Sequence, residues 1–328
     1  MFKVICYTTM VILREERRIF LQVVFTNVLI LFMLLFLGYL IGIKKIVAHS
    51  SINDLTNLVV DVSMPCTIAL SMVRPFDARL LGDAIKVIVG ILIFQLFLSG
   101  LAYYAAKILK VDPKKSGSWI FSLVFSNNAF VGYPLMYALY GNDGLFLMAM
   151  GNIVQNVLIF SIGIKLITLN YNLKDRIRLR HIIFTKQNIA VVVGMFIFFL
   201  QIPVPKPVLT LVTYVANLTV PLSMMVVGMS LSRYDVSKMF TDKEAYRLTI
   251  IRMVLLPLVM VAIFKGLGIQ ANQNLPLAIL FFTAALPAPA FTTIMAERYN
   301  TSIEFSSKCV FLTTIISILT VPILAGLL

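Results

Sequence analysis

Long apolar runs constrain this chain more than any other feature of its sequence. Ten segments of about 17–26 residues are each long enough to cross a ~30 Å hydrocarbon core as a helix. The apolar residues come in runs rather than in strict alternation, which argues against a β-barrel. The sequence therefore predicts an all-α polytopic membrane protein with ten transmembrane helices and no room for a soluble domain. The segments are Phe20–Gly42, Leu55–Val73, Val87–Ala106, Gly117–Tyr140, Gly144–Ile164, Ile189–Pro205, Pro207–Ser232, Leu248–Phe264, Leu275–Ala296 and Cys309–Leu328.

The residue content excludes several other classes of protein. Charged residues are 13% of the 328, whereas an average soluble domain has about a quarter. The net charge of +14 indicates basic cytoplasmic loops rather than a nucleic-acid partner. Cys6, Cys66 and Cys309 lack a metal or redox spacing, and His49 and His181 lie outside the apolar segments. We therefore expect no enzymatic activity, no cofactor and no metal site.

Lys and Arg residues are distributed unequally between the two sides of the predicted bundle. Of the 28, nineteen fall on the side of the longest loop and nine on the side of the two termini. The more basic side of a membrane protein is the cytoplasmic side. We therefore predict a multi-pass plasma (inner) membrane protein with both termini on the non-cytoplasmic side, although the basic stretch Arg14–Arg18 argues mildly against it.

The two halves of the chain resemble each other. In the second segment Asp61 precedes Pro65 by four residues, and in the seventh Asn217 precedes Pro221 by four residues, an offset of 156 between the prolines. The fourth and ninth segments align at a similar offset of 159. A repeat of five spans must enter the membrane the second time from the opposite side, so the two repeats are expected to be inverted, as in many secondary transporters.

The repeat divides the chain into four parts. Residues 1–19 form an N-terminal extension, which is a poor signal peptide because its charges follow its apolar part. Residues 20–164 form the first five-helix repeat, residues 165–188 a basic cytoplasmic loop, and residues 189–328 the second repeat.

Two helices are expected to be broken near the middle of the membrane. Asn128 lies ~17 Å into the fourth segment and Pro287 ~18 Å into the ninth, at 1.5 Å per residue. Pro287 and Pro289 both lack an N–H group and disfavour helix in the residue before them. Opened backbone at this depth exposes N–H groups that a carboxylate can satisfy, so we favour a binding site over a structural kink. The predicted helix breaks are at Pro65, Pro134, Pro221 and Pro287.

Amide side chains near these breaks are candidates for substrate contacts. Asn152, Gln155 and Asn156 lie on one face of the fifth segment, either as helix–helix contacts or as ligands. In the tenth segment Thr314, beside Thr313, is a weaker counterpart. The predicted substrate-binding set is Asn127, Asn128, Asn152, Gln155, Asn156, Pro287, Pro289 and Thr314.

Asp61 is the carboxylate that lies well inside an apolar segment. Such residues are functional candidates, and proton coupling through Asp61 is one hypothesis. The alternative is an ion pair with Lys44 or Lys45, or an interaction with a helix terminus. Arg252 and Lys308 lie near predicted cytoplasmic ends, where both side chains are expected to reach the surface.

The sequence resembles the auxin efflux carrier family, which includes plant PIN-type carriers and bacterial relatives labelled as malonate transporters. The resemblance extends from Val28 to Leu328 and is carried by LFLGYLIGIKK, NLVVDVSMP, NNAFVGYPLMYALYG and AALPAPAFTTIMAERYN. It implies two inverted repeats whose fourth and ninth helices cross, a scaffold of spans 1, 2, 6 and 7, a homodimer and elevator-type motion. It also assigns Asn128 to the family's substrate-contacting Asn. PIN carriers have Pro-Asn at the first crossing and often a long hydrophilic loop, whereas this chain has Asn127-Asn128 and a short loop, as in bacterial members.

These observations together predict a secondary transporter of small organic anions, expected to be mono- or dicarboxylates. The alternative is a sodium- or proton-coupled symporter or antiporter of a related crossed-helix fold that moves another solute. Such proteins tend to have acidic residues at the crossing, and the crossing segments of this chain contain none. The expected partners are the anion, the lipid bilayer and a second copy of the chain, with no nucleic acid.

Overall fold

The structure is a computed structural model that describes most of the chain as helices. Within the described residues there is no β-strand. The described residues are 22, 25–27, 29–48, 50–171, 185–269 and 274–327. The predicted N-terminal extension, residues 1–19, and much of the predicted basic loop lie outside them.

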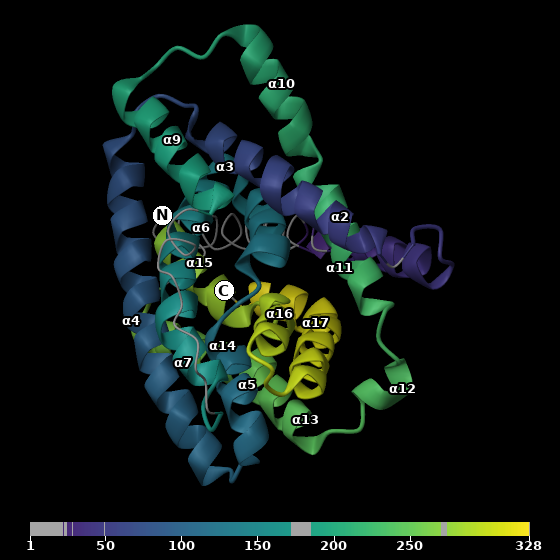
Figure 1. Cartoon of the computed structure of the whole chain (residues 1–328). Helices are drawn as coiled ribbons and strands as arrows, with labels where there is room; N and C mark the ends of the chain where they lie inside the picture. The colour runs from purple at the N-terminus through teal and green to yellow at the C-terminus, as the bar shows by residue number, and fades with distance from the viewer. Residues whose placement is uncertain are drawn as a thin grey trace, which may run out of the picture.

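The helical elements follow one another with short connections (Figure 1). The first is the helix Phe25–Ile43. Segments labelled η are π-helical, with one residue more per turn than an α-helix. In chain order the next elements are α2 Ser51–Leu58, η1 Val59–Ser63, α3 Met64–Met72, α4 Ala78–Ile108, α5 Pro113–Val124, η2 Asn128–Gly132, α6 Tyr133–Leu158, η3 Ile159–Gly163 and α7 Ile164–Ile167. They continue with α9 Lys186–Leu200, α10 Lys206–Asn217, α11 Thr219–Leu231, α12 Val236–Met239, α13 Lys243–Ile250, η4 Ile251–Leu255, α14 Leu256–Gly266, α15 Leu275–Ala285, α16 Phe291–Arg298 and α17 Ile303–Ala325.

In the described part of the chain, seven helical stretches are long and apolar enough to cross a membrane, and two apolar helices are shorter. One of the seven, Pro113–Ile167, has 55 residues, which is far more than one crossing needs. It is interrupted between α5 and η2, and it turns again at Gly141, whose φ of 59° and ψ of −145° are not helical. Glycine adopts this positive φ without the steric cost that a side chain brings. The molecule is therefore a multi-pass, all-helical membrane protein.

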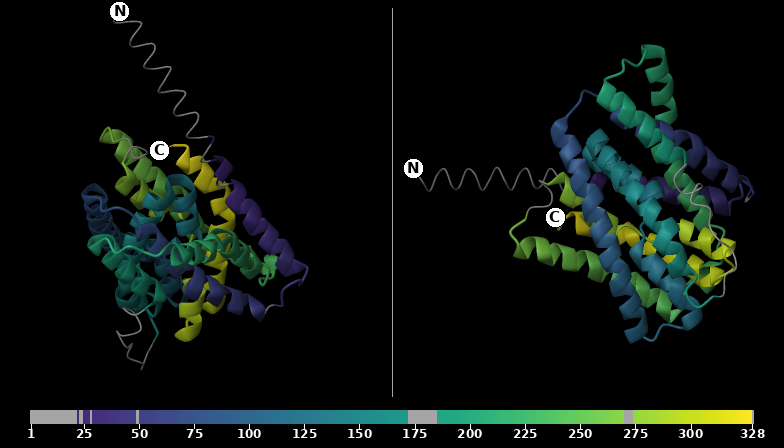
Figure 2. Two further views of the ribbon diagram at one scale, coloured as in Figure 1. Left: turned by 90° about the horizontal axis from the view of Figure 1, so that it is seen from above. Right: turned by 60° about the vertical axis from the view of Figure 1, so that its left-hand side comes forward.

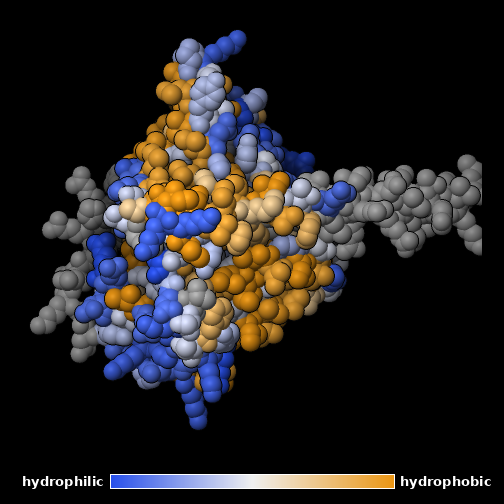
Figure 3. All heavy atoms as spheres, turned by 90° about the vertical axis from the view of Figure 1, so that its right-hand side faces the viewer, coloured by the Kyte–Doolittle hydropathy of each residue, from blue (hydrophilic) through white to orange (hydrophobic). Residues whose placement is uncertain are grey.

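The helix surfaces agree with an environment of lipid. On α4 the side chains of Phe97, Leu101 and Ile108 are 69%, 51% and 79% exposed. Figure 3 shows a broad apolar face, with hydrophilic side chains gathered toward its lower left. Exposing this much apolar surface to water is costly, whereas the hydrocarbon core of a bilayer accommodates it.

Prolines widen these helices more often than they break them. Pro65, Pro134 and Pro257 each lie two residues after a π-helical segment. A proline ring clashes with the carbonyl four residues earlier, and an extra residue in the preceding turn relieves that clash. The predicted break at Pro65 is therefore wrong, because the helix Ser51–Met72 is continuous through it.

The other three predicted breaks have different outcomes. Pro134 lies at the start of α6, and the interruption comes earlier, at Phe125–Asn127. Pro221 lies inside α11, and the chain turns before it, at Leu218. Pro287 alone lies within an opened segment, between α15 and α16.

The helices pack as two groups, which Figures 1 and 2 show from three directions. The first group consists of the helix Phe25–Ile43 with α2, α3, α9, α10 and α11. The second group consists of α4 to α7 and α13 to α17. Within the first group, backbones approach closely: a Cβ on Gly38 would meet the Met225 carbonyl, and a Cβ on Gly228 would meet the Leu35 carbonyl. Small residues allow such close approach between membrane helices.

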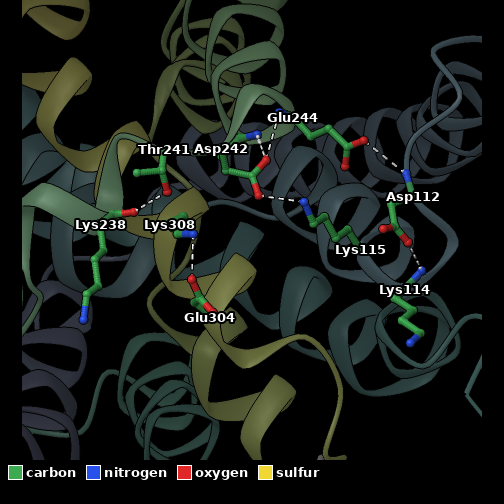
Figure 4. Close-up of polar contacts among 10 residues, drawn as sticks. Asp112, Lys114, Lys115, Lys238, Thr241, Asp242, Glu244, Glu304 and Lys308 are labelled. Atoms are coloured by element: carbon green, nitrogen blue, oxygen red, sulfur yellow. Dashed lines mark hydrogen bonds and ion pairs between the residues drawn. The ribbon is translucent and has the colours of Figure 1, made fainter.

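A charged cluster joins the starts of two helices of the second group, α5 and α13 (Figure 4). Asp242 forms an ion pair with Lys115 of α5 at 2.7 Å and accepts from the N–H of Glu244 at 3.0 Å, at the start of α13. The N–H of Asp112 in turn donates to the Glu244 carboxylate at 3.2 Å. Burial opposes ionisation of the Asp242 carboxyl, but the hydrogen bond and charge of Lys115 hold its pKa below its usual value. The ionised carboxylate therefore stabilises the folded protein.

Replacing Asp242 with asparagine should lower the melting temperature at pH 7 by about 2–5 °C. Because the pKa of Asp242 is lower in the folded state, its contribution is complete above the usual value of 3.8 and is lost as the pH falls below it. The difference between the two proteins should therefore vanish under strongly acidic conditions. Melting curves of the detergent-solubilised proteins measure this. Asp235→Asn is the matched control, because Asp235 is itself exposed and caps only the short α12, so its loss should have a smaller effect. An equal loss in both variants would contradict the prediction.

Candidate functional site

The two interrupted helices meet at their interruptions. After α5 ends at Val124 the backbone is extended at Phe125, and after α15 ends at Ala285 it is extended at Leu286. The N–H of Asn127 donates to the carbonyl of Pro287 at 3.0 Å. Ser126 donates through its hydroxyl to the carbonyl of Thr283 in α15. We call this meeting point, residues 125–128 and 286–290, the crossing.

The two breaks have different local causes. Pro287 and Pro289 open the second one, because neither residue can donate to a helical hydrogen bond. The first break has no proline. There Asn127 begins the new helix: its side chain accepts from the N–H of Phe130 at 3.3 Å, and its carbonyl accepts from two further N–H groups. An asparagine is a favourable N-cap, so the new helix begins here without a proline.

Gln155 completes the hydrogen bonds of the first break. Its amide accepts from the N–H of Ser126 at 3.2 Å and donates to the Ser126 carbonyl at 2.8 Å. Gln95 of α4 donates to the same Gln155 oxygen at 2.7 Å. Buried backbone groups that leave a helix need such partners, since lipid offers none. Gln155 therefore braces the crossing, and its polar atoms are already engaged.

The other predicted ligands lie around this point with different surroundings. Asn152 is buried and hydrogen-bonded to the hydroxyl of Tyr133, whereas Asn156 is half-buried. Thr314 is buried, but its hydroxyl donates to Val310 of its own helix. The neighbouring Thr313 instead reaches the crossing and accepts from the N–H of Ala288 at 3.1 Å.

Asn128 differs from the other amides. Its side chain is 1% exposed, and neither its oxygen nor its nitrogen has a hydrogen-bond partner among the described residues. It is the first residue of η2, where a helix begins. At the corresponding start of α16 the hydroxyl of Thr292, 0% exposed, likewise has no partner in the described part of the chain. Buried polar atoms without partners are rare and costly, and their coincidence at two helix starts indicates a place for a polar ligand.

Arg252 is the functional residue that sequence reasoning misplaced. We expected it to reach the cytoplasmic surface, and that expectation is wrong, because its side chain is 0% exposed and lies at the crossing. Its guanidinium binds carbonyls near the end of α5 and two carbonyls directly after α15, on both sides of the crossing. The acceptors are Leu286 O at 3.1 Å, Ser122 O at 2.9 Å, Leu123 O at 2.5 Å, Ser126 Oγ at 2.8 Å and Pro287 O at 3.4 Å. A signal was present in the sequence: a charge four residues inside an apolar segment, about one helical turn from its start.

Two further charges lie away from the crossing. Asp61 forms an ion pair with Lys186 at 2.7 Å, within the first group, so neither Lys44 nor Lys45 is its partner. Lys308 was also expected at the surface, but its side chain is 9% exposed and is paired with Glu304 at 2.7 Å. Neither residue contacts the opened segments by a described hydrogen bond or ion pair.

Two hollows flank the boundary between the groups. One is a closed apolar cavity of about 10 Å³ between the helix Phe25–Ile43 and α17, which lie side by side in Figure 2. It accommodates no more than about one water molecule, and Thr314 and Ser317 supply its polar atoms. The other is an open pocket of about 830 Å³ between the α3–α4 connection and the turn at Gly141, where Arg74 pairs with Asp143 at 2.5 Å.

Comparison with known proteins agrees with this architecture. The family described as membrane transport protein matches residues 23–174 and 173–325. An uncharacterised transporter of Methanocaldococcus jannaschii is 26% identical over 303 residues, covering 90% of this chain and 96% of the relative. A second uncharacterised transporter, of Methanothermobacter thermautotrophicus, is 23% identical over 301 residues, with the same coverage of 90% and 96%. This family consists of transporters rather than enzymes, and the resemblance to auxin efflux carriers is thereby confirmed. The chain belongs to the membrane transport protein family.

Proposed function

We propose that this protein is a secondary carrier of small organic anions, with carboxylates as the substrate class, and that the anion binds at the crossing. The observation that carries the proposal is the side-chain amide of Asn128, which is buried at the start of η2 with both polar atoms free of partners among the described residues. An amide nitrogen donates to a carboxylate oxygen. A bound carboxylate would therefore relieve the cost of the buried, unpaired donor.

Helix electrostatics support an anion at this place. The starts of η2 and α16 lie beside the crossing. At η2 the N–H groups of Phe130, Val131 and Gly132 already bind Asn127, so this helix start would act on an anion through its electrostatic potential. Each helix start also carries about half a positive charge. Discontinuous membrane helices whose N-termini point at an anionic group are a recurrent solution in secondary transporters.

We further propose that ten spans form two inverted repeats and that transport proceeds by elevator-type motion of the second group against the first. The packing of the helices into two groups supports this division. The contacts between the groups include apolar packing, with Asn27 donating to the Ala138 carbonyl at 2.8 Å and Arg74 paired with Asp143 as polar links. A homodimer through the first group, as in auxin carriers, belongs to the same proposal.

Both termini should lie on the non-cytoplasmic side of the membrane, because nineteen of 28 basic residues then face the cytoplasm. A cysteine introduced at the C-terminus of a Cys6/Cys66/Cys309 to serine background should react with an impermeant maleimide in intact cells. A cysteine in place of Ser237, on the opposite side, should react only after lysis. The reverse pattern would contradict the topology and the inverted repeat.

Uptake by the purified protein in proteoliposomes tests the function itself. Radiolabelled propionate, malonate and benzoate should each be compared with the corresponding uncharged amide, with and without gradients of sodium and protons. Saturable uptake of at least one carboxylate, and of no amide, is the expected result. Uptake of none of the carboxylates, together with binding of a cation or neutral solute, would overturn the proposal in favour of the coupled carrier for another solute.

A further inference from the structure

The environment of Arg252 has a consequence for the charge of the crossing. A guanidinium has five N–H donors, and here they are directed to the carbonyl ends of α5 and α15 and to Ser126. No carboxylate among the described residues forms an ion pair with Arg252. Among the described residues, the positive charge of Arg252 is therefore compensated only by the groups that it binds at these helix ends.

The partial charges of the helix ends show what Arg252 adds to the crossing. Four half-helix ends meet at the crossing: two carbonyl ends, of α5 and α15, and two N–H ends, of η2 and α16. Each end is equivalent to about half an elementary charge, negative at the carbonyl end and positive at the N–H end. The four ends therefore cancel, and a crossing built of helices alone has no preference for an anion.

We propose that Arg252 gives the crossing its net positive charge, about +1, and thereby selects a monoanion without touching it. The inference rests on the proposed function, because it concerns the anion that binds there. Arg252 is a positioning residue: it neutralises the carbonyl ends of α5 and α15, so that the N–H ends of η2 and α16, with Asn128, are left to act on the substrate. The bound carboxylate is then the missing counter-ion of Arg252.

The same charge affects the return of the empty carrier. A buried charge without a counter-ion is costly in a membrane interior. The loaded crossing is close to neutral, whereas the empty crossing retains its positive charge. Exchange of one anion for another should therefore be faster than net uptake in the wild-type protein.

The single tryptophan offers a direct readout of binding. Trp119 is fully buried in α5, three residues before Ser122, whose carbonyl Arg252 binds. Its fluorescence, together with the melting temperature, can follow titration of the purified protein with propionate, malonate and benzoate and with their uncharged amides. The wild-type protein should bind at least one carboxylate and none of the amides.

Two sets of variants separate charge from structure. Arg252→Met should lower carboxylate affinity at least tenfold, whereas Arg252→Lys, which keeps the charge, should retain more of it. Lys308→Met is the matched control, because that buried cation already has Glu304 as its counter-ion, and it should bind as the wild type does. Ser122→Asp introduces a carboxylate at the residue whose backbone carbonyl accepts from Arg252 and should abolish anion binding, whereas Ser122→Asn, of similar shape, should preserve it. The Ser122 pair keeps the test decisive if Arg252→Met does not fold.

The possible failures are distinguishable. If the wild-type protein binds a carboxylate and Ser122→Asp or folded Arg252→Met binds it equally well, the role of Arg252 is wrong while the anion carrier stands. If the wild-type protein binds the uncharged amides as tightly as the carboxylates, charge selection is wrong. If it binds no carboxylate and takes none up, the proposed function fails.

Discussion

Replacing Asn128 with alanine should weaken carboxylate binding about tenfold to hundredfold. The variant loses one amide donor to a charged acceptor, a hydrogen bond worth about 1.5–3 kcal/mol, and each 1.4 kcal/mol is about a factor of ten in affinity. The folded protein should be little affected, because the Asn128 side chain has no hydrogen-bond partner to lose among the described residues. Titration of purified protein, followed by melting temperature and by equilibrium uptake of labelled carboxylate, measures the change.

The control for this experiment is Asn217→Ala, which removes an exposed asparagine at the end of α10. It should bind carboxylate with wild-type affinity. If Asn128→Ala also binds with wild-type affinity while remaining folded, Asn128 is a structural residue, and the substrate site must be sought elsewhere, for example in the open pocket beside Arg74.

Replacing Gln155 with leucine should lower the melting temperature by about 5–20 °C. Leucine leaves two buried groups without partners, the N–H of Ser126 and the side-chain nitrogen of Gln95, whereas the Ser126 carbonyl still accepts from the N–H of Asn128 at 2.9 Å. An unsatisfied buried polar group costs about 1–3 kcal/mol, and each kcal/mol corresponds to about 2–4 °C for a protein of this size. Melting curves in detergent, monitored by light scattering and by Trp119 fluorescence, give the shift.

Asn156→Leu is the matched control for stability, because it makes the same kind of change at the next position of the same helix, where the side chain is half-buried. It should change the melting temperature by no more than about 2 °C, as for most substitutions away from buried polar networks. A small effect of Gln155→Leu, with lost binding, would instead assign Gln155 to the substrate, as the sequence alone had allowed.

Several features could be predicted from the sequence because they depend on local composition. The apolar runs predicted an all-helical membrane protein, which is confirmed, and the motifs predicted its family, which is also confirmed. The interruptions at Asn127–Asn128 and at Pro287 follow from proline geometry and capping, which act within a few residues. The family resemblance implied that the two interrupted helices cross, and the hydrogen bond from Asn127 to Pro287 joins them.

The π-helical segments show where local reasoning fell short. Pro65 lies inside an apolar segment and predicts a break in the helix. The helix instead continues through it with a wider turn. Both responses relieve the same clash with the preceding carbonyl. Which of them occurs depends on the packing of the helix against its neighbours, here α9 and α10.

By itself, the sequence determined the class of protein, its family and the opening at Pro287, because hydrophobic length and proline act on their own segment. The second opening was predicted at Pro134, and the structure has it at Phe125–Asn127. Only the tertiary structure decided what each polar side chain at the crossing does. Gln155, Asn152 and Asn128 share a chemistry, but the first braces Ser126, the second pairs with Tyr133 and the third remains without a partner. The position of Arg252 near a predicted helix end suggested that it reaches the surface. Its hydrogen-bond acceptors lie at the ends of α5 and α15, more than 30 residues away along the chain. The role of a buried charge depends on the groups that surround it, and those groups are brought together only when the helices pack.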